Sequence, residues 1–471
     1  MKFKFTIFLL IGFVLLLGYM LFLDKKPVDK ASAPEEKLVT LASADIEKIT
    51  LKKESETLTF KKDDKGDWLV AEPLETKADA SEVNMLAEAF ADLKIERVVE
   101  KEGGDPKKYQ IPLKEISIWS KGQTTPVKVL VGMENPLDKS LFAQKEGDKR
   151  IVLIPSAIST SLGKTLFDYR QKDVFKFETG DVTGIKLQTK DAKWDAQKKD
   201  DGWFLQAPLK AQAKEMKITG FLDALGNMKA KEFAAENKSA DDLKKYGLDK
   251  AEAKVTLAIP KSNKDVTFLI HKATDKTYVT TSDSNKIIVA DGDPFAELDK
   301  KPDDYRETKV AAFSSWQASK VALKKGGLDL ILTKAANDKW YFDAAQKEEA
   351  DASKIETFVR KIESLESTEF VDAPKSLAEH GIDKPQAEVT ITTKEAGEKA
   401  VEKSVTVFVG KDDKDKKKVV VKNAKLDYLF RVDSSLLDDF PKEKKDWKLP
   451  EPEKKEPDKK EAENKADPAK K

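Results

Sequence analysis

The fold of this chain is decided by residues 68–98, which read WLVAEPLETKADASEVNMLAEAFADLKIERV. The large apolar residues of this stretch return at matched spacing 135 residues later, and again after a further 137 residues. The three sets are Trp68, Val83, Leu86, Phe90, Leu93 and Val98; Trp203, Ile218, Phe221, Leu225, Met228 and Phe233; and Trp340, Ile355, Phe358, Ile362, Leu365 and Phe370. Six matched positions without a gap indicate an internal repeat, and tandem repeats usually build scaffolds or binding surfaces.

Each copy is expected to combine short strands with one helix. Val83, Leu86, Phe90 and Leu93 fall at steps of three, four and three, which places them on one face of a helix. Short alternating apolar runs lie before and after this segment and predict strands, in the order β-β-α-β-β-β. The predicted fold class is α+β, with a largely antiparallel sheet in each module and one sheet face covered by the helix.

The helix start is also marked in the sequence. Asp79 followed by Glu82 resembles a capping box, and Asp351 stands at the corresponding place in the third copy. The second copy has Lys214 there, so we expect its helix to be capped less well.

The repeat divides the chain into three modules at residues 41–177, 178–313 and 314–450. Residues 24–40 are charged and contain Pro27 and Pro34, which is typical of a linker. Residues 451–471 have no aromatic or aliphatic residue that could anchor a core, so this charged tail is expected to be disordered.

Residues 1–23 predict a short cytoplasmic end and a transmembrane anchor. Residues 5–23 carry no charge, and a helix of that length spans about 28 Å, close to the hydrocarbon thickness of a bilayer. A cleaved signal peptide would have a shorter apolar region, and the nearest cleavage-like site, Ala31 to Ala33, is distant and precedes Pro34. We therefore expect an uncleaved signal-anchor in the inner membrane, with the bulk of the chain extracytoplasmic, in the periplasm of a Gram-negative cell.

The charge balance argues against a nucleic-acid partner. The chain has 86 basic and 85 acidic residues and a net charge of +1, so its surface lacks a long-range field that would attract a polyanion. Only six of the basic residues are arginine, the favoured donor to phosphates and guanine edges. Cysteine is absent, which excludes disulfides and thiolate nucleophiles.

No residue pattern indicates catalysis. His271 occupies the position that is Gly132 and Gly410 in the other copies, and His380 occupies that of Tyr246. A position that changes freely between copies is typical of packing or of a strand end. Metal-ligand spacings and glycine-rich phosphate loops are not found. We expect no catalytic, cofactor-binding or metal-binding residue.

The residues singled out are structural. We expect the repeat anchors to hold each sheet against its own helix; the alternative is that the tryptophans form a row on which a ligand stacks. These anchors are Trp68, Trp203, Trp340, Phe90, Leu225 and Ile362. Each module also closes on a polar-aromatic mark that predicts a contact between modules, as a hinge ion pair or as a partner surface. The marks are Asp168, Tyr169 and Arg170; Asp304, Tyr305 and Arg306; and Asp446 and Trp447.

Several motifs are shared with a known group. They are the apolar N-terminal segment, the strand GWFL at 202–205 before Pro208, the run KYGLD at 245–249 with its echo HGIDKP at 380–385, and DYRQKDV at 168–174. On these motifs the chain resembles the domain of unknown function family numbered 4340 over most of residues 40–450. Module one departs from the pattern with YQIP at 109–112, and module three has Ala345 where Pro73 and Pro208 stand.

Proteins similar to this family are often encoded beside membrane subunits of ABC-type exporters, including those linked to gliding motility. The resemblance therefore implies an accessory envelope component with a membrane protein partner such as an exporter subunit. Our leading hypothesis is a non-catalytic, membrane-anchored scaffold. One alternative is a protein that binds an envelope glycan or lipid in clefts between modules. Another is a carboxylate-based hydrolase, which would need convergent buried acids in a single module.

Overall fold

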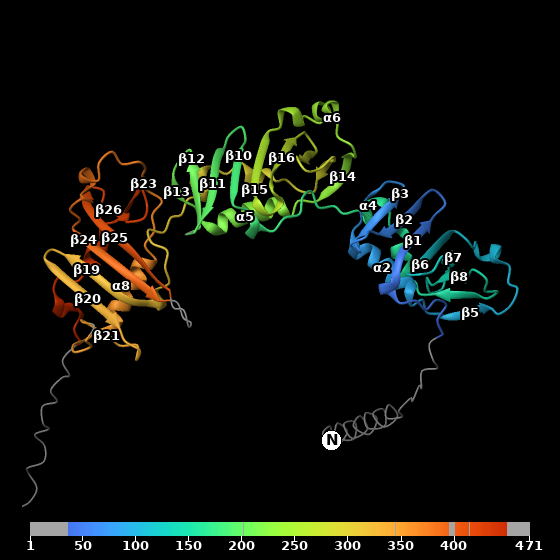
Figure 1. The fold of residues 1–471 in the computed structure, drawn as a ribbon, viewed down its shortest axis with the longest axis horizontal. Helices are drawn as coiled ribbons and strands as arrows, with labels where there is room; N and C mark the ends of the chain where they lie inside the picture. The colour runs from blue at the N-terminus through green and yellow to red at the C-terminus, as the bar shows by residue number, and fades with distance from the viewer. Residues whose placement is uncertain (1–35, 201, 344, 395–400, 414, 450–471) are drawn as a thin grey trace, which may run out of the picture. The chain divides into compact units, whose positions relative to one another are not determined.

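The computed structural model describes residues 36–449, except for residues 201, 344, 395–400 and 414 (Figure 1). These residues form two compact units, of which the first ends at Lys172 and the second begins at Asp173. The predicted anchor at residues 5–23 and the tail at 451–471 lie outside the described residues. No helix in the described part of the chain has the length and apolar content needed to cross a bilayer.

The described residues of the first unit contain one nine-stranded sheet with the order β4-β3-β2-β1-β6-β7-β8-β9-β5. Its strands are β1 (Ile46–Lys52), β2 (Thr57–Lys62), β3 (Trp68–Glu72), β4 (Thr76–Lys77), β5 (Arg97–Glu100), β6 (Lys114–Ser120), β7 (Val127–Glu134), β8 (Leu141–Lys145) and β9 (Ile151–Ile154). The helices are α2 (Ala80–Ala91), α3 (Ile158–Gly163) and α4 (Leu166–Tyr169).

The second unit contains two further sheets. The strands of module two are β10 (Gly184–Gln188), β11 (Lys193–Lys199), β12 (Gly202–Ala207), β13 (Ala211–Gln212), β14 (Ala230–Ala235), β15 (Ala253–Ile259), β16 (Lys264–Lys272), β17 (Thr277–Thr281) and β18 (Ile287–Ala290). Its helices are α5 (Glu215–Gly226), α6 (Ala240–Lys245) and α7 (Phe295–Leu298).

Module three has the same plan. Its strands are β19 (Ala318–Lys325), β20 (Leu328–Lys334), β21 (Trp340–Tyr341), β22 (Glu349–Ala350), β23 (Phe370–Val371), β24 (Ala387–Lys394), β25 (Glu402–Asp413), β26 (Lys418–Asn423) and β27 (Leu429–Asp433). Its helices are α8 (Ala352–Glu363) and α9 (Leu436–Asp439). The strand orders β13-β12-β11-β10-β15-β16-β17-β18-β14 and β22-β21-β20-β19-β24-β25-β26-β27-β23 match that of the first sheet.

The three sheets confirm the predicted α+β modules, while the predicted order β-β-α-β-β-β is incomplete. All strand pairs in the described residues are antiparallel. The order has five strands where each sheet has nine, so it lacks two strands before the helix and two after it. Two strands that the sequence does not mark in module one are β4, which has two residues, and β5, whose residues are half-buried or exposed and therefore do not alternate. Such strands leave no periodic apolar signal, because their pairing is set by tertiary contacts rather than by burial.

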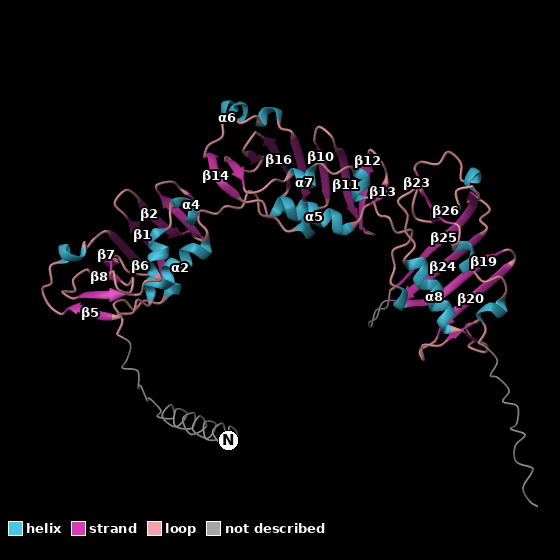
Figure 2. Cartoon of the chain, turned by 180° about the vertical axis from the view of Figure 1, so that it is seen from behind, coloured by secondary structure: helices cyan, strands magenta, loops and turns pink. Residues whose placement is uncertain are grey.

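Each sheet buries the face that its main helix covers. In the first module Ile49 pairs with Phe60 on β2 and with Ile118 on β6, and all three side chains are fully buried. Val83, Leu86 and Phe90 of α2 are fully buried as well, as the helical spacing predicts. Figure 2 shows α5 and α8 lying across one face of the sheet of their own module. The apolar core of each module is thus a layer between one sheet face and one helix.

The N-terminal caps of the three main helices agree with the prediction made from their residues. The Asp79 side chain accepts hydrogen bonds from the backbone amides of Ser81 and Glu82, and Asp351 accepts one from Lys354. Lys214 occupies the same position before α5 and makes no side-chain cap. The weaker cap predicted for module two is confirmed.

In each module the chain arrives beside the end of the main helix and leaves beside its start. The incoming segments form isolated antiparallel bridges just after that helix: Lys37 with Lys94, Asp173 with Lys229, and Lys309 with Glu366. The outgoing segments form bridges just before it: Ala78 with Arg170, Ala213 with Arg306, and Ala350 with Lys448. Every module is therefore closed by its own two chain ends.

The linker predicted at residues 24–40 is wrong at its C-terminal end. Leu38 and Val39 are buried in the core of the first unit. The backbone amide of Leu38 donates to the carbonyl oxygen of Leu93 at 2.7 Å. Two buried apolar side chains and a paired backbone hold this segment to the module, although its flanking charges are typical of a linker.

Candidate functional site

The repeat anchors lie inside the cores of their modules. Trp68, Trp203, Trp340, Phe90, Leu225 and Ile362 are all buried, none more than 4% exposed. The indole nitrogen of Trp68 donates to Asn84 on α2 at 2.7 Å, which joins the strand to the helix. Because the three indoles are enclosed, they offer no face on which a ligand could stack.

The aromatic residue that closes each module is also a core residue. The Tyr169 ring centroid lies 4.8 Å from that of Phe60, and the Tyr305 centroid lies 4.6 Å from that of Trp194. Trp447 lies 5.3 Å from Phe358 in the same way. Burial raises the pKa of the Tyr305 hydroxyl well above its ordinary value, because ionisation would place a charge in the core.

The backbone of these aromatic residues fixes the start of the main helix. The carbonyl oxygens of Tyr169, Tyr305 and Trp447 accept hydrogen bonds at 2.7–2.8 Å, and the donors are the amides of Asp79, Lys214 and Asp351. The aspartates of the marks are local as well: Asp168, Asp304 and Asp446 accept from the backbone amides of Thr165, Lys301 and Glu443. These aspartates and aromatic residues therefore stabilise their own module.

Arg306 is the member of its mark that reaches the next module. Its guanidinium donates to both carboxylate oxygens of Asp372, at 3.0 and 2.5 Å. The guanidinium carbon lies 3.6 Å from the ring centroid of Phe370 and 4.4 Å from that of Tyr428. The Arg306 side chain is 1% exposed, whereas Asp372 is half exposed. We call Arg306, Phe370, Asp372 and Tyr428 the Arg306 clasp.

The segment that follows Arg306 is paired with both modules. The amide of Glu307 donates to the carbonyl oxygen of Gln212 in module two. Further along, the amide of Val310 donates to the Leu365 carbonyl oxygen, and the buried side chain of Asn423 donates to the Val310 carbonyl oxygen at 2.9 Å. Residues 306–310 are thus a paired connection between modules two and three.

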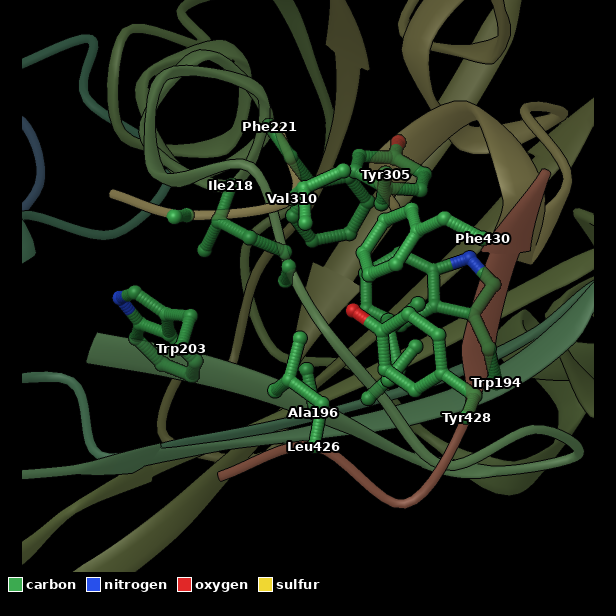
Figure 3. Packing of buried hydrophobic residues seen from close by; sticks show 14 of the residues in the cluster. Trp194, Ala196, Trp203, Ile218, Phe221, Tyr305, Val310, Leu426, Tyr428 and Phe430 are labelled. Carbon is green, nitrogen blue, oxygen red and sulfur yellow. The ribbon is translucent and has the colours of Figure 1, made fainter. Parts of the chain in front are cut away.

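The apolar cores of modules two and three form one continuous cluster. Figure 3 shows Trp194, Tyr305, Tyr428 and Phe430, of which the first two come from module two and the last two from module three. Burial raises the pKa of Tyr428 to about 12, and the nearby Arg306 charge opposes this shift. The junction between these modules is a packed interior with a buried cation.

A groove opens beside this junction, and we call it the junction groove. Its walls come from β12 and β13 of module two, from Ala312, Phe313, Ser314 and Gln317, and from β24, β25, β26 and the residues after β26 in module three. Its volume is about 310 Å³. Among the described residues that line it, the charged ones are Lys403 and Lys425, and no carboxylate is present.

Neither histidine lines the junction groove, and the two lie in different modules. His271 is on β16, opposite Tyr278 of β17, and its ring fills the space beside Gly247, where a Cβ would collide with it. His380 ends a short 3-10 turn at 378–380. Within the described residues, no group of three or more His, Asp or Glu side chains is placed to hold a metal ion.

Two residues of the junction, Asp372 and Trp316, were not identified from the sequence. Asp372 lies two residues after Phe370, one of the repeated apolar positions, and 66 residues after Arg306, so its pairing with Arg306 becomes visible only in the fold. Trp316 lies in the 3-10 turn η7 (Ser315–Gln317) and is 73% exposed. The matching turns at 43–45 and 179–181 carry Ala44 and Gly180 at this position, so the comparison of copies could have identified Trp316.

Comparison with known proteins gives one family. The family described as Domain of unknown function (DUF4340) matches residues 29–111, 68–204 and 203–379. No curated protein matches the chain. Similar solved structures include a DNA polymerase sliding clamp from Pseudomonas aeruginosa with ligand, 7% identical over 84% of this chain and 92% of that chain, with a TM-score of 0.15. The DNA polymerase III subunit beta of that organism is 8% identical over 83% and 92%, also with a TM-score of 0.15. A TM-score of 0.15 is too low to indicate a shared fold.

Proposed function

The chain belongs to the family of the domain of unknown function DUF4340, and we propose that it is a non-catalytic, membrane-anchored extracytoplasmic protein. In this proposal it serves as an accessory or scaffold subunit of an ABC-type exporter or another envelope complex. Its mechanism is contact through several modules at once, with the anchor keeping their effective concentration high near a membrane partner.

The observation that carries the proposal is the threefold repetition of one closed module. Each module holds its incoming and outgoing segments by backbone bridges, so it can present a firm surface without help from a ligand. The cores are filled by the residues that repeat, including the aromatic residue that closes each module. A chain that devotes its repeated residues to packing is suited to binding other molecules on its exterior.

The incoming segment of module one limits the distance from the membrane. Among the described residues backbone pairing begins at Glu36, so about twelve residues separate the predicted anchor from the module and span at most ~43 Å. A partner of module one would then lie close to the bilayer surface, as a membrane subunit does.

Site-directed crosslinking tests this proposal, because the chain has no cysteine of its own. Leu137→Cys, Met216→Cys and Leu377→Cys place one thiol on each module, at side chains that are 90%, 78% and 39% exposed. Each variant is labelled in native membranes with a photoreactive maleimide, and crosslinked partners are identified by mass spectrometry. We expect the same membrane complex to be captured from at least two modules.

The unsubstituted, cysteine-free protein is the matched control, and it should capture nothing. The scaffold role is rejected if none of the three positions captures a membrane complex in cells that express one. The topology is checked separately with a reporter that is active only in the cytoplasm, fused to the C-terminus. An active reporter would place the modules on the cytoplasmic side.

A further inference from the structure

We propose that one end of module one is a contact surface for the lipid bilayer, into which the side chains of Leu113 and Leu137 insert. This inference rests on the membrane anchor of the proposed function and adds a second, reversible contact with the same bilayer. It depends on two exposed leucines that the other modules lack and on a hairpin tip with internally paired amides. We call Leu113 and the tip at 135–140 the leucine end.

The two leucines lie at the end of the sheet where β7 finishes. The amide of Leu113 donates to the carbonyl oxygen of Val131 at 2.8 Å, which places Leu113 beside the last residues of β7. Leu137 lies in the tip that joins β7 to β8. Leu137 is 90% exposed and Leu113 is 45% exposed, and the prolines that precede them, Pro136 and Pro112, are exposed as well. This end of module one therefore presents apolar side chains to solvent.

The other two modules carry polar residues at the corresponding positions. Leu113 immediately precedes β6, and the residues that immediately precede β15 and β24 are Glu252 and Gln386. The tips that correspond to 135–140 read ATDK at 273–276 and KDKK at 414–417, without a large apolar residue. A single exposed leucine is common on a soluble protein. Two exposed leucines at one end of a single copy indicate a surface that this module alone uses.

The backbone of the tip is suited to leaving water. The Leu137 amide donates to the Asn135 side chain at 3.3 Å, and the Lys139 amide donates to the Asn135 carbonyl oxygen at 2.9 Å. The Asn135 amide donates to the carbonyl oxygen of Ser140 at 2.7 Å, and Pro136 has no amide hydrogen. A backbone group that enters lipid without a partner is costly. Because these amides are already paired, the tip can carry Leu137 into the bilayer surface without refolding.

The charged groups of the tip suit the level of the lipid headgroups. The Asp138 carboxylate accepts from the hydroxyl of Ser140 at 2.5 Å and from its amide at 3.0 Å, and these bonds lower the pKa of Asp138. The Lys139 side chain is 72% exposed, and its ion pair with Glu134 spans 3.9 Å. An ammonium group on a flexible stem can reach a lipid phosphate while the neighbouring leucine lies deeper.

The bilayer is favoured over a protein pocket because the proposed anchor keeps module one beside it. About twelve residues, at most ~43 Å when extended, join the predicted anchor to Glu36. Within that reach the effective concentration of the module at the bilayer is high, so a contact too weak to hold a free protein becomes populated. A protein pocket would need a matching shape, whereas lipid accepts a protruding hairpin tip of any outline.

Fluorescence quenching in vesicles provides the test. Leu137→Cys is labelled with a nitrobenzoxadiazole maleimide, and the full chain is reconstituted into phosphatidylethanolamine–phosphatidylglycerol vesicles with and without nitroxide-labelled lipid. Met216→Cys, on α5 of module two and 78% exposed in the native residue, is labelled in the same way as the control. We expect nitroxide lipid to quench the label at position 137 at least threefold more than the label at position 216. Iodide in the water phase should quench it at least threefold less.

A second substitution tests the leucine that carries no label. Leu113→Glu introduces the residue type that module two has at this place, and about half of the Leu113 side chain is already exposed. In the labelled Leu137→Cys protein, Leu113→Glu should reduce quenching by nitroxide lipid at least twofold. Met216→Glu is the matched control and should leave the quenching unchanged. Circular dichroism confirms that each variant is folded.

Flotation of the chain with the vesicles reports on the anchor separately. If the chain floats but the labels at positions 137 and 216 are quenched equally, the bilayer contact is wrong and the anchor stands. The same holds if Leu113→Glu has no more effect than Met216→Glu. A chain that does not float overturns both the anchor and the contact. A label at position 137 that is shielded from iodide in native membranes, but not quenched by nitroxide lipid in vesicles, would show that the leucine end binds a protein instead.

Discussion

At the scale of single residues, Arg306 shows why one basic side chain cannot be exchanged for another. Its planar guanidinium stacks on Phe370 and bonds both oxygens of Asp372 at the same time. The ammonium group of lysine is a compact charge that cannot form a planar fork or stack in this way. In the buried position of Arg306, loss of either contact leaves a cation with an incomplete set of partners.

Arg306→Lys is therefore expected to lower the free energy of unfolding of the second unit by about 2 kcal/mol. The measurement is urea denaturation followed by circular dichroism. Asp372→Asn is the comparison: it keeps the stacking on Phe370 and one hydrogen-bond acceptor but removes the charge opposite a buried cation, so its loss should be smaller than that of Arg306→Lys without being zero. An Asp372→Asn loss larger than that of Arg306→Lys would contradict this account of the clasp.

Tyr428 predicts a loss of stability at high pH. The folded protein holds the phenolic proton up to a pKa of about 12, whereas the unfolded chain releases it near 10.0. The resulting stability is present below about pH 10 and is lost as the pH rises to about 12, because the unfolded state then binds fewer protons.

In Tyr428→Phe, the fall in unfolding free energy between about pH 10 and pH 12 should be smaller by about 2 kcal/mol. The titration of lysines is common to both proteins and cancels in the comparison. At pH 7 the variant should lose less than about 1 kcal/mol, since the Tyr428 hydroxyl lies near Arg306 and the Gln212 backbone but has no hydrogen bond of good geometry to a described residue. Identical pH profiles would show that Tyr428 does not titrate in this way.

The polar-aromatic marks could be recognised in the sequence, but the partners of their side chains could not. Asp304, Tyr305 and Arg306 are adjacent in the sequence, and this adjacency suggested one shared contact between modules. The structure gives them three tasks, a backbone cap, a core ring and a buried cation. Side chains of consecutive residues point in different directions, so neighbours in sequence need not share a partner. The groove was not predicted, because its lining comes from segments distant in sequence.

At the scale of elements, the three main helices allow their N-cap residues to be compared in the same structural setting. Asp79, Lys214 and Asp351 have nearly the same extended backbone, with φ of −74°, −72° and −70°. All three donate their amide to the carbonyl oxygen of the aromatic residue that closes the module. What differs is the side chain alone, so the contribution of a carboxylate cap can be measured with little change elsewhere.

Lys214→Asp should raise the free energy of unfolding of the second unit by about 1 kcal/mol. The new carboxylate would accept from the first amides of α5 and would replace a positive charge at the positive end of the helix. Asp351→Ala should have the opposite effect, a loss of about 1 kcal/mol. Both are measured by urea denaturation, and a destabilised Lys214→Asp would mean that the lysine has a role the cap position does not explain.

Elements with periodic burial were predictable from the sequence, and short edge elements were not. The strand around Ile49 alternates in burial from Ile49 to Lys52, and the helix around Leu86 repeats as its buried face requires. The strand around Phe60 alternates in its apolar residues, although Thr59 between Leu58 and Phe60 is buried as well. Strands such as β4 and β23 have two residues each and owe their pairing to their neighbours. Leu38 and Val39 were assigned to a linker because two apolar residues among charges give no periodicity.

At the scale of the whole molecule, three repeats do not give three separate cores. The first unit has a main core of its own, whereas modules two and three share one continuous cluster. A shared core makes the two modules one cooperative unit of unfolding, because neither can lose its packing without exposing the other.

Calorimetry should therefore show two principal unfolding transitions. Phe90→Ala should lower the first unit's transition alone, with a loss of about 3–5 kcal/mol from the buried cavity. Phe221→Ala in module two and Ile362→Ala in module three should both lower the other transition. If Phe221→Ala and Ile362→Ala shift different transitions, the shared core does not couple the modules.

The bridges made by the incoming and outgoing segments have an evolutionary consequence. Because each copy receives the chain at one end of its helix and releases it at the other, a gene segment duplicated in register would yield a complete cassette. Such a cassette could be inserted between two modules without interrupting a strand. The original copy would already contain the residues that form the bridges at both ends. Lineages that carry this architecture can then alter how many copies they contain by whole steps, leaving the interior of each copy intact.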